Sequence, residues 1–175
     1  RSLDSLAAEM GKLKKLPVAT SDEGAIVLSK EEKQVKPDFL LDPAIAENAT
    51  TLAEKYRVLT ALQVDKEIAK LYEMSVDDYD KAITKLLADI NDPSFKAIED
   101  EGSLDEATET LYNAMNANGR INFFWQMAAT SLIEQLYITA QKSDNFIAAF
   151  NDDAAANSTF RIVLLKDAIN RLTEY

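Results

Sequence analysis

The side chains best suited to bind a ligand lie together in one apolar stretch of the chain. Asn118, Asn122 and Gln126 follow one another at intervals of four residues, so neighbouring members of the series share a helix face. Trp125, the only tryptophan, lies beside them, and Glu134 extends the row with an ionisable carboxyl group. Buried amides and carboxylates need hydrogen-bond partners in the protein, in water or in a ligand. These five residues are therefore the candidate ligand-binding residues.

The same row has a structural interpretation, which we favour. Most buried polar groups are satisfied by other protein groups, and such a network fixes the register of packed helices. In that case Glu134 bonds to another protein group, and the arginines that could pair with it are Arg57, Arg120, Arg161 and Arg171. Replacing Glu134 by leucine then lowers stability, because the carboxyl group is paired in the interior.

The neighbouring aromatic residues allow a similar choice between a cavity wall and a filled core. Phe123, Phe124 and Trp125 are consecutive, and successive helical residues turn by about 100°, so the three rings cannot all face one way. At least one of them must contact a second neighbour or solvent. A row of aromatics at helical spacing is usually core, and we expect the same here.

Most catalytic and metal-binding chemistries are excluded by composition. The chain contains no cysteine and no histidine, which excludes disulfides, zinc fingers, iron–sulfur clusters, cysteine nucleophiles, Ser-His-Asp triads and the Glu-x-x-His pairs of di-iron bundles. The acidic clusters at residues 77–80, 99–101 and 152–153 lack the ligand spacing of a calcium loop. Helix caps and solvated faces explain them better. We expect no enzyme activity, no metal and no cofactor, and a carboxylate-based enzyme is only a third possibility.

Charge and hydropathy bear on two classes of partner. The net charge of −11 argues against nucleic acid and against anionic membrane surfaces, since both attract basic patches. Residues 121–139 are long and apolar enough to suggest a membrane span. An acid near the bilayer centre costs about 2.5–3.5 kcal/mol, however. The polar residues inside this stretch are Asn122, Gln126, Glu134 and Gln135. We therefore predict a buried bundle helix.

The element that positions these residues is a long apolar stripe from residue 104 to residue 140. Its steps of three and four predict a helix, and Ser103 with Glu106 forms an N-terminal capping pair. Asn118 and Gly119 interrupt the pattern, which predicts a kink or a short break between two helices. The alternative is close approach of a neighbouring backbone or ligand at the glycine.

The same spacing predicts further helices. Asp42 is a good N-cap and Pro43 fits the first helical position, so a long helix is expected from there to Met74. Ser75 is expected to cap the next helix, which ends near Ile90. Shorter or outer helices are expected at residues 3–16, 29–36, 93–100 and 143–150, and a last bundle helix is expected at residues 154–172.

The fold class that follows is an all-α, up-and-down bundle of four main helices in a single domain. Residues 43–175 are expected to form its core, and residues 1–42 a peripheral segment with an extra helix and an irregular stretch. Phe39, Leu40 and Leu41 are too apolar for a solvated loop, so we expect them to pack against the bundle.

Two stretches carry a family resemblance: residues 36–43 (KPDFLLDP) and residues 118–126 (NGRINFFWQ), the latter continuing to the EQLY of residues 134–137. They resemble segments of a family of all-helical lipoproteins from gut and oral bacteria of the Bacteroides group. The resemblance covers most of residues 36–175. It implies a helical bundle tethered by a lipid on an upstream cysteine outside this chain, facing the periplasm or the exterior. The family has no established activity, so it implies no catalytic residues.

The sequence thus predicts a non-enzymatic structural or interaction module, the soluble part of a cell-envelope lipoprotein in the periplasm or at the outer membrane. Its partner would be a protein, with membrane contact only through the lipid. The alternative is a small-ligand binding protein whose pocket lies beside Asn122, Trp125, Gln126 and Glu134. A filled core with an exposed apolar patch favours a protein partner, whereas a deep cavity with unpaired amides favours a ligand.

Overall fold

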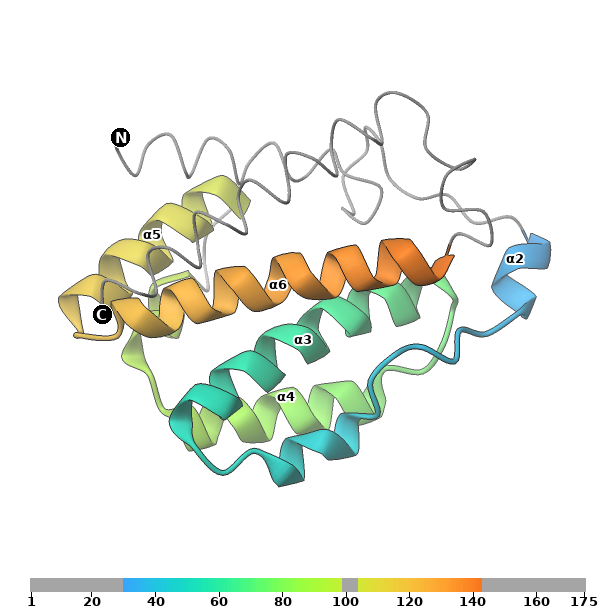
Figure 1. Ribbon diagram of the computed structural model, residues 1–175. Helices are drawn as coiled ribbons and strands as arrows, with labels where there is room; N and C mark the ends of the chain where they lie inside the picture. The colour runs from blue at the N-terminus through green and yellow to red at the C-terminus, as the bar shows by residue number, and fades with distance from the viewer. Residues whose placement is uncertain (1–29, 99–103, 143–175) are drawn as a thin grey trace.

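The computed structural model describes residues 30–98 and 104–142, and in these ranges the only regular elements are helices. In chain order they are α2 (Lys30–Gln34), the 3-10 helix η2 (Pro43–Asn48), α3 (Leu52–Leu71), α4 (Asp77–Ile90), the 3-10 helix η3 (Pro93–Ile98), α5 (Leu104–Ala117) and α6 (Ile121–Lys142) (Figure 1). The predicted all-α bundle is confirmed for this part of the chain. The helices predicted at residues 3–16, 143–150 and 154–172 and the cap predicted at Ser103 lie outside the described residues. The division at residue 42 stays a prediction.

The helix predicted to begin at Asp42 does begin there, but it is short. The Asp42 carboxylate accepts a hydrogen bond of 2.9 Å from the backbone N–H of Ala44, and Pro43 occupies the first turn, as its fixed φ favours. The element that follows is η2, which ends at Asn48. The prediction of one continuous helix from here to Met74 was therefore wrong.

A second cap explains why the long helix is divided. The hydroxyl of Thr51 accepts from the backbone N–H of Glu54 at 3.2 Å, and the Glu54 carboxylate accepts from the N–H of Thr51 at 3.1 Å. This reciprocal capping box satisfies two N–H groups that a helix start leaves without partners. α3 consequently begins at Leu52, even though the apolar stripe continues across the boundary.

The predicted interruption at Asn118 and Gly119 is a complete break between α5 and α6. The N–H of Gly119 bonds to the carbonyl of Asn116 at 3.2 Å, and the N–H of Arg120 bonds to the carbonyl of Met115 at 2.7 Å. These two bonds, with Gly119 at φ 70°, form a Schellman motif. A Cβ built on Gly119 meets no described atom within 4 Å, so backbone conformation, rather than close packing, accounts for the glycine.

Helices α3 and α4 pack antiparallel and are joined by a short loop. Ion pairs connect Lys66 to Asp80 near the loop, and Lys55 to Asp89 (3.9 Å) near the opposite ends. α4 begins one residue later than expected for a cap at Ser75, whose hydroxyl accepts only a long bond of 3.5 Å from the N–H two residues on.

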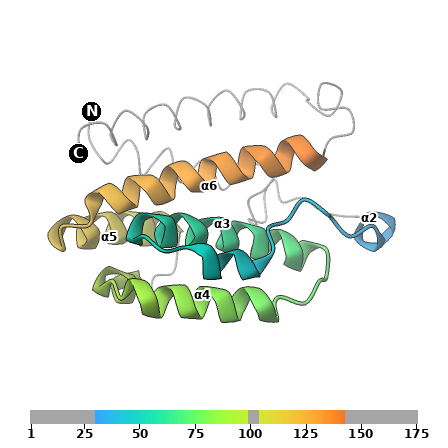
Figure 2. The same ribbon diagram turned by 60° about the horizontal axis from the view of Figure 1, so that its bottom comes forward.

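Helix α6 runs parallel to α3. The guanidinium of Arg57 donates to the Gln126 side-chain carbonyl at 2.8 Å across an offset of 69 residues, and Asp65 pairs with Glu134 across the same offset. The intervening α4, η3 and α5 return the chain to the beginning of α3. Figures 1 and 2 show α3 lying between α6 and α4.

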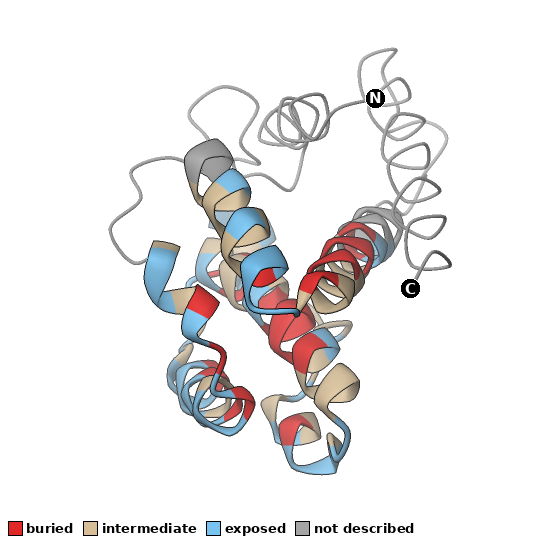
Figure 3. Cartoon of the chain, turned by 90° about the vertical axis from the view of Figure 1, so that its left-hand side faces the viewer, coloured by how far each residue is buried: buried red, intermediate tan, exposed pale blue. Residues whose placement is uncertain are grey.

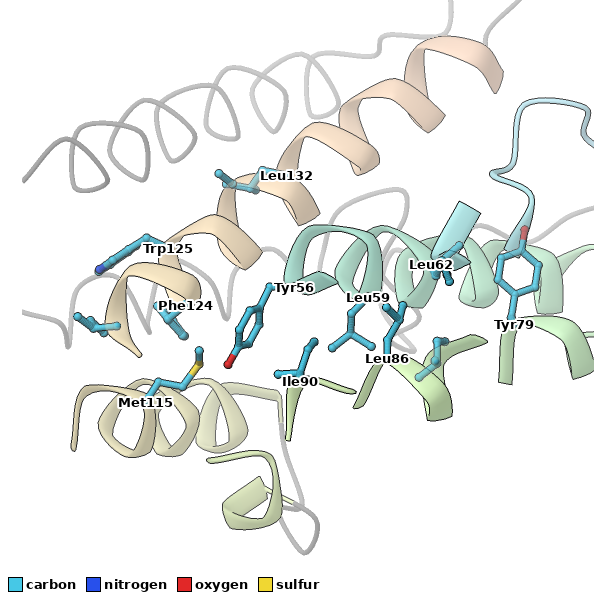
Figure 4. Packing of buried hydrophobic residues seen from close by; sticks show 14 of the residues in the cluster. Tyr56, Leu59, Leu62, Tyr79, Leu86, Ile90, Met115, Phe124, Trp125 and Leu132 are labelled. Carbon is cyan, nitrogen blue, oxygen red and sulfur yellow. The ribbon is translucent and has the colours of Figure 1, made fainter. Parts of the chain in front are cut away.

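The core lies between these helices, with the buried residues gathered on the sides that face one another (Figure 3). Its centre is the face of α3 that carries Tyr56, Leu59 and Leu62, each fully buried. The other helices contribute Leu86, Ile90, Met115, Phe124, Trp125 and Leu132 (Figure 4). Burying such side chains is the main favourable contribution to folding.

The segment between α2 and η2 also packs on the bundle. Leu40 and Leu41 contact the main core, and Phe39 contacts a smaller cluster formed by Ile68, Tyr72 and Ile138. The prediction that these apolar residues are not a solvated loop is therefore confirmed. Within the described ranges, no helix is long and apolar enough to cross a membrane.

Candidate functional site

Two of the predicted ligand-binding residues, Asn118 and Gln126, form hydrogen bonds to other parts of the protein. Asn118, at the end of α5, donates from its amide to the buried hydroxyl of Ser94 at 2.9 Å and so ties the α5–α6 turn to η3. Gln126 accepts from Arg57 and ties α6 to α3. Asn122 lies one turn before Gln126 and is half-buried.

Trp125 belongs to an aromatic cluster between α5 and α6. It is 1% exposed, and its ring meets those of Phe124 and Tyr112 edge to face, at centroid distances of 5.2 and 5.9 Å. Edge-to-face pairs at these distances are favourable. Trp125 therefore serves as core.

Phe123 turns the other way, as the helical period requires. Its ring stacks on that of Tyr56 in α3, with centroids 4.6 Å apart and planes inclined by 10°. The prediction that the three consecutive aromatic rings divide between different neighbours is confirmed.

Tyr56 also stands at the centre of a polar junction between α3, η3 and the start of α6. Its hydroxyl donates to the Asp92 carboxylate at 2.5 Å and accepts from the Arg120 guanidinium at 3.0 Å. The other Asp92 oxygen accepts from the backbone N–H of Ser94 at 2.9 Å. Four groups from separate elements are thereby satisfied in one place.

The electrostatic environment of this junction keeps Tyr56 protonated and Asp92 ionised. Burial and the neighbouring Asp92 raise the pKa of Tyr56, so the phenol stays protonated and acts as a donor. Burial alone raises the pKa of Asp92, but the hydrogen bonds from Tyr56 and Ser94 and the charge of Arg120 outweigh it, and the pKa lies below its usual range. A phenol that resists ionisation beside a stable carboxylate holds elements together and is poorly suited to act as a base.

The most unusual group is a pair of acids in the interior, Asp65 of α3 and Glu134 of α6. Asp65 is completely buried. One of its oxygens accepts from the backbone N–H of Leu41 at 2.7 Å, and the carbonyl of Leu41 accepts from the hydroxyl of Tyr79 at 2.7 Å. The pair therefore joins α3 and α6 to the segment before η2, and through that segment to α4.

The two carboxyl groups interact closely enough to shift each other's pKa. The second oxygen of Asp65 and one oxygen of Glu134 are buried and accept from no donor among the described residues. Burial, then the hydrogen bond with Asp65 and its charge, raises the pKa of Glu134 to about 8. Burial also raises the pKa of Asp65, against the hydrogen bonds from Glu134 and Leu41. The raised pKa keeps Glu134 protonated at neutral pH, so its O–H is a donor available to the neighbouring Asp65 carboxylate.

Of the four arginines predicted as possible partners of Glu134, the two in the described part of the chain bond to other residues. Arg57 bonds to Gln126, and Arg120 bonds to Tyr56. The remaining candidates, at positions 161 and 171, lie outside the described residues.

Carboxylate-based enzymes also use two carboxyl groups, one protonated and one ionised. In this pair, however, the oxygens without a hydrogen-bond donor among the described residues are both buried, so neither faces an open site. Among the described residues, no cluster of three or more acids is positioned to hold a metal ion.

A shallow pocket of about 290 Å³ lies elsewhere, between η2 and α4. Its charged lining residues are Asp42, Glu47, Asp78, Lys81 and Lys85. Ligand sites are mostly apolar with a few placed polar groups. This pocket has charges of both signs, none of the predicted residues and no aromatic ring, so it is the weaker candidate.

Sequence reasoning missed Asp65, although the chain contained a signal for it. Ala61, Leu62, Ile68 and Ala69 are all buried, and Asp65 falls on the same face at helical spacing. An acid in the middle of an apolar face predicts a buried carboxyl group.

Comparisons of this chain with protein-family models, with curated proteins and with solved structures give no match.

Proposed function

We propose that this protein is a non-enzymatic structural or interaction module, the folded part of a bacterial cell-envelope lipoprotein, that binds a protein partner. One observation favours the interaction module over the ligand-binding alternative. The polar side chains of Asn118, Gln126 and Glu134 are engaged with η3, with α3 and with Asp65. Groups engaged in this way fix the arrangement of the bundle instead of lining a ligand site. The cell-envelope assignment is supported by the resemblance at residues 36–43 and 118–126.

The surface we propose for the partner is on α6. Ile133 and Tyr137 are 52% and 45% exposed and, four residues apart, share one helix face. Among the described residues, Val35 is the other large apolar side chain with high exposure, and it lies apart in sequence, just beyond α2. Exposed apolar groups together on one face favour a protein partner with a complementary apolar surface.

Site-specific photocrosslinking tests this proposal. The photoreactive p-benzoylphenylalanine replaces Tyr137 in cells that make the protein naturally, and the matched control places it at exposed Lys85 on α4. We expect one discrete protein adduct from position 137 and none from position 85. Ile133→Glu should abolish the adduct without changing the melting temperature. Equal adducts at both positions, or none, would contradict the proposed surface.

Native mass spectrometry distinguishes the alternative function. We expect the purified protein to have the mass of the bare chain, or multiples of it, both before and after denaturation. Extra mass that disappears on denaturation would identify a retained small molecule. That result would replace the interaction module with the ligand-binding protein.

A further inference from the structure

Leu41 is held to the bundle at both of its backbone polar groups. Its N–H donates to the Asp65 carboxylate, and its carbonyl accepts from the Tyr79 hydroxyl, each at 2.7 Å. The neighbouring Leu40 and Phe39 cover apolar core residues. The position of residues 36–42 thus depends on a buried carboxylate that also interacts with Glu134.

We propose that the Asp65–Glu134 pair is a proton-dependent clasp, which holds residues 36–42 on the bundle while the two carboxyl groups share a proton and releases them when that proton is lost to solvent. Two carboxylates within hydrogen-bond reach repel each other strongly in a buried site. Separation of the pair moves Asp65, and Asp65 is the acceptor of the Leu41 N–H. The inference is independent of the proposed function.

The charges around the pair favour this behaviour. From α4 the pair faces Tyr79, whose pKa burial and the charges of Asp65, Asp42 and Glu134 raise to about 12. The phenol therefore stays protonated throughout. Asp42, in the segment itself, also places its negative charge near Tyr79.

No lysine or arginine of the described chain is among the groups that shift the pKa of Asp65 or of Glu134. Lys66, next to Asp65 in α3, is paired with Asp80. Lys36, at the start of the segment, donates to the backbone carbonyl of Tyr72. Because no cation within residues 30–98 and 104–142 compensates a second negative charge, the proton decides between the held and the released segment.

Spin-label distance measurements test the clasp directly, since the chain has no native cysteine. Asp38→Cys in the segment and Gln63→Cys in α3, both exposed positions, report the segment. The matched control pair, Gln63→Cys with Lys85→Cys, reports α3 against α4. Spectra are recorded at about pH 6 and about pH 9.5, on either side of the titration. We expect the reporter pair to lose its narrow distance peak at the higher pH, while the control pair keeps it.

Glu134→Gln distinguishes the clasp from general alkaline expansion. The amide can donate to Asp65 but cannot titrate, so the reporter pair should give the same narrow peak at both pH values. A wild-type peak that stays narrow, or a variant that opens like the wild type, overturns the proposal.

A measurement on the unsubstituted protein keeps the test valid if the variant fails to fold. Carbon-detected NMR follows the Glu134 carboxyl group, and the amide shift of Leu41 is followed in parallel. We expect both to change with one midpoint near pH 8. A midpoint near the ordinary value of 4.5, or a Leu41 amide that does not follow Glu134, refutes the clasp.

Discussion

Asp65 on α3 and Glu134 on α6 bring two interacting carboxyl groups together in the interior. The contact requires α3 and α6 to be parallel and in one register, since Arg57 and Gln126 meet across the same offset two turns earlier. A buried pair of acids is costly unless a proton neutralises one of them. The register of the bundle and the protonation of Glu134 are therefore coupled.

This coupling predicts that the protein loses stability as the pH rises. The pKa of Glu134 is raised from 4.5 to about 8 in the folded state, so between these values the folded protein binds more protons than the unfolded chain. Stability is then greatest below pH 4.5 for this group and is lost progressively up to about pH 8. We expect a loss of roughly 1–3 kcal/mol, discounted for the partial exposure of Glu134. Urea denaturation at a series of pH values measures it, and a flat or rising profile would contradict it.

Two substitutions of Glu134 should have opposite consequences. Glu134→Gln retains a donor to Asp65, so the free energy of unfolding at neutral pH should change by less than about 1 kcal/mol and its pH dependence should disappear. Glu134→Leu removes the polar side chain of α6 that interacts with the buried Asp65 carboxylate, which should cost about 1–3 kcal/mol. Chemical denaturation at neutral pH compares the two. Equal stabilities for wild type and Glu134→Leu would remove Glu134 from the network.

The Tyr56 junction should behave as a cooperative unit. Tyr56→Phe removes the donor to Asp92 and the acceptor of Arg120, and we expect a loss of about 1–3 kcal/mol, mainly because Asp92 keeps a buried oxygen without its partner. Combining this change with Asp92→Asn should cost less than the sum of the two single changes. Thermal denaturation gives all three values, with exposed Tyr137→Phe as the control that should have no effect. Strict additivity would show that the contact is not energetically coupled.

The local features of this fold were predictable because they depend on neighbours in sequence. Steps of three and four residues predicted the helices, Asp42 with Pro43 predicted a cap, and Gly119 predicted a break. The capping box of Thr51 and Glu54 is also a local signal, but the apolar stripe continues across it and so predicted one continuous helix instead of η2 and α3.

The partners in the candidate site could not be predicted by that reasoning. Asp65 and Glu134 meet because α3 and α6 pack at one particular register, and that register is determined by side chains such as Tyr56 and Phe123 that interlock across the interface. Local periodicity shows that each acid is on a buried face, but it contains no information on which residue of another helix lies opposite.

Gly119 offers a test in which backbone conformation can be separated from packing. Its φ of 70° lies in the left-handed region, and a Cβ there meets no described atom within 4 Å. Gly119→Ala should therefore cost about 1 kcal/mol from backbone strain alone. Gly119→Asn should cost less, because asparagine enters this region more readily than alanine. Thermal denaturation of the two variants compares them. If both lose the same stability, or if alanine is neutral, the strain explanation of the α5–α6 turn is wrong.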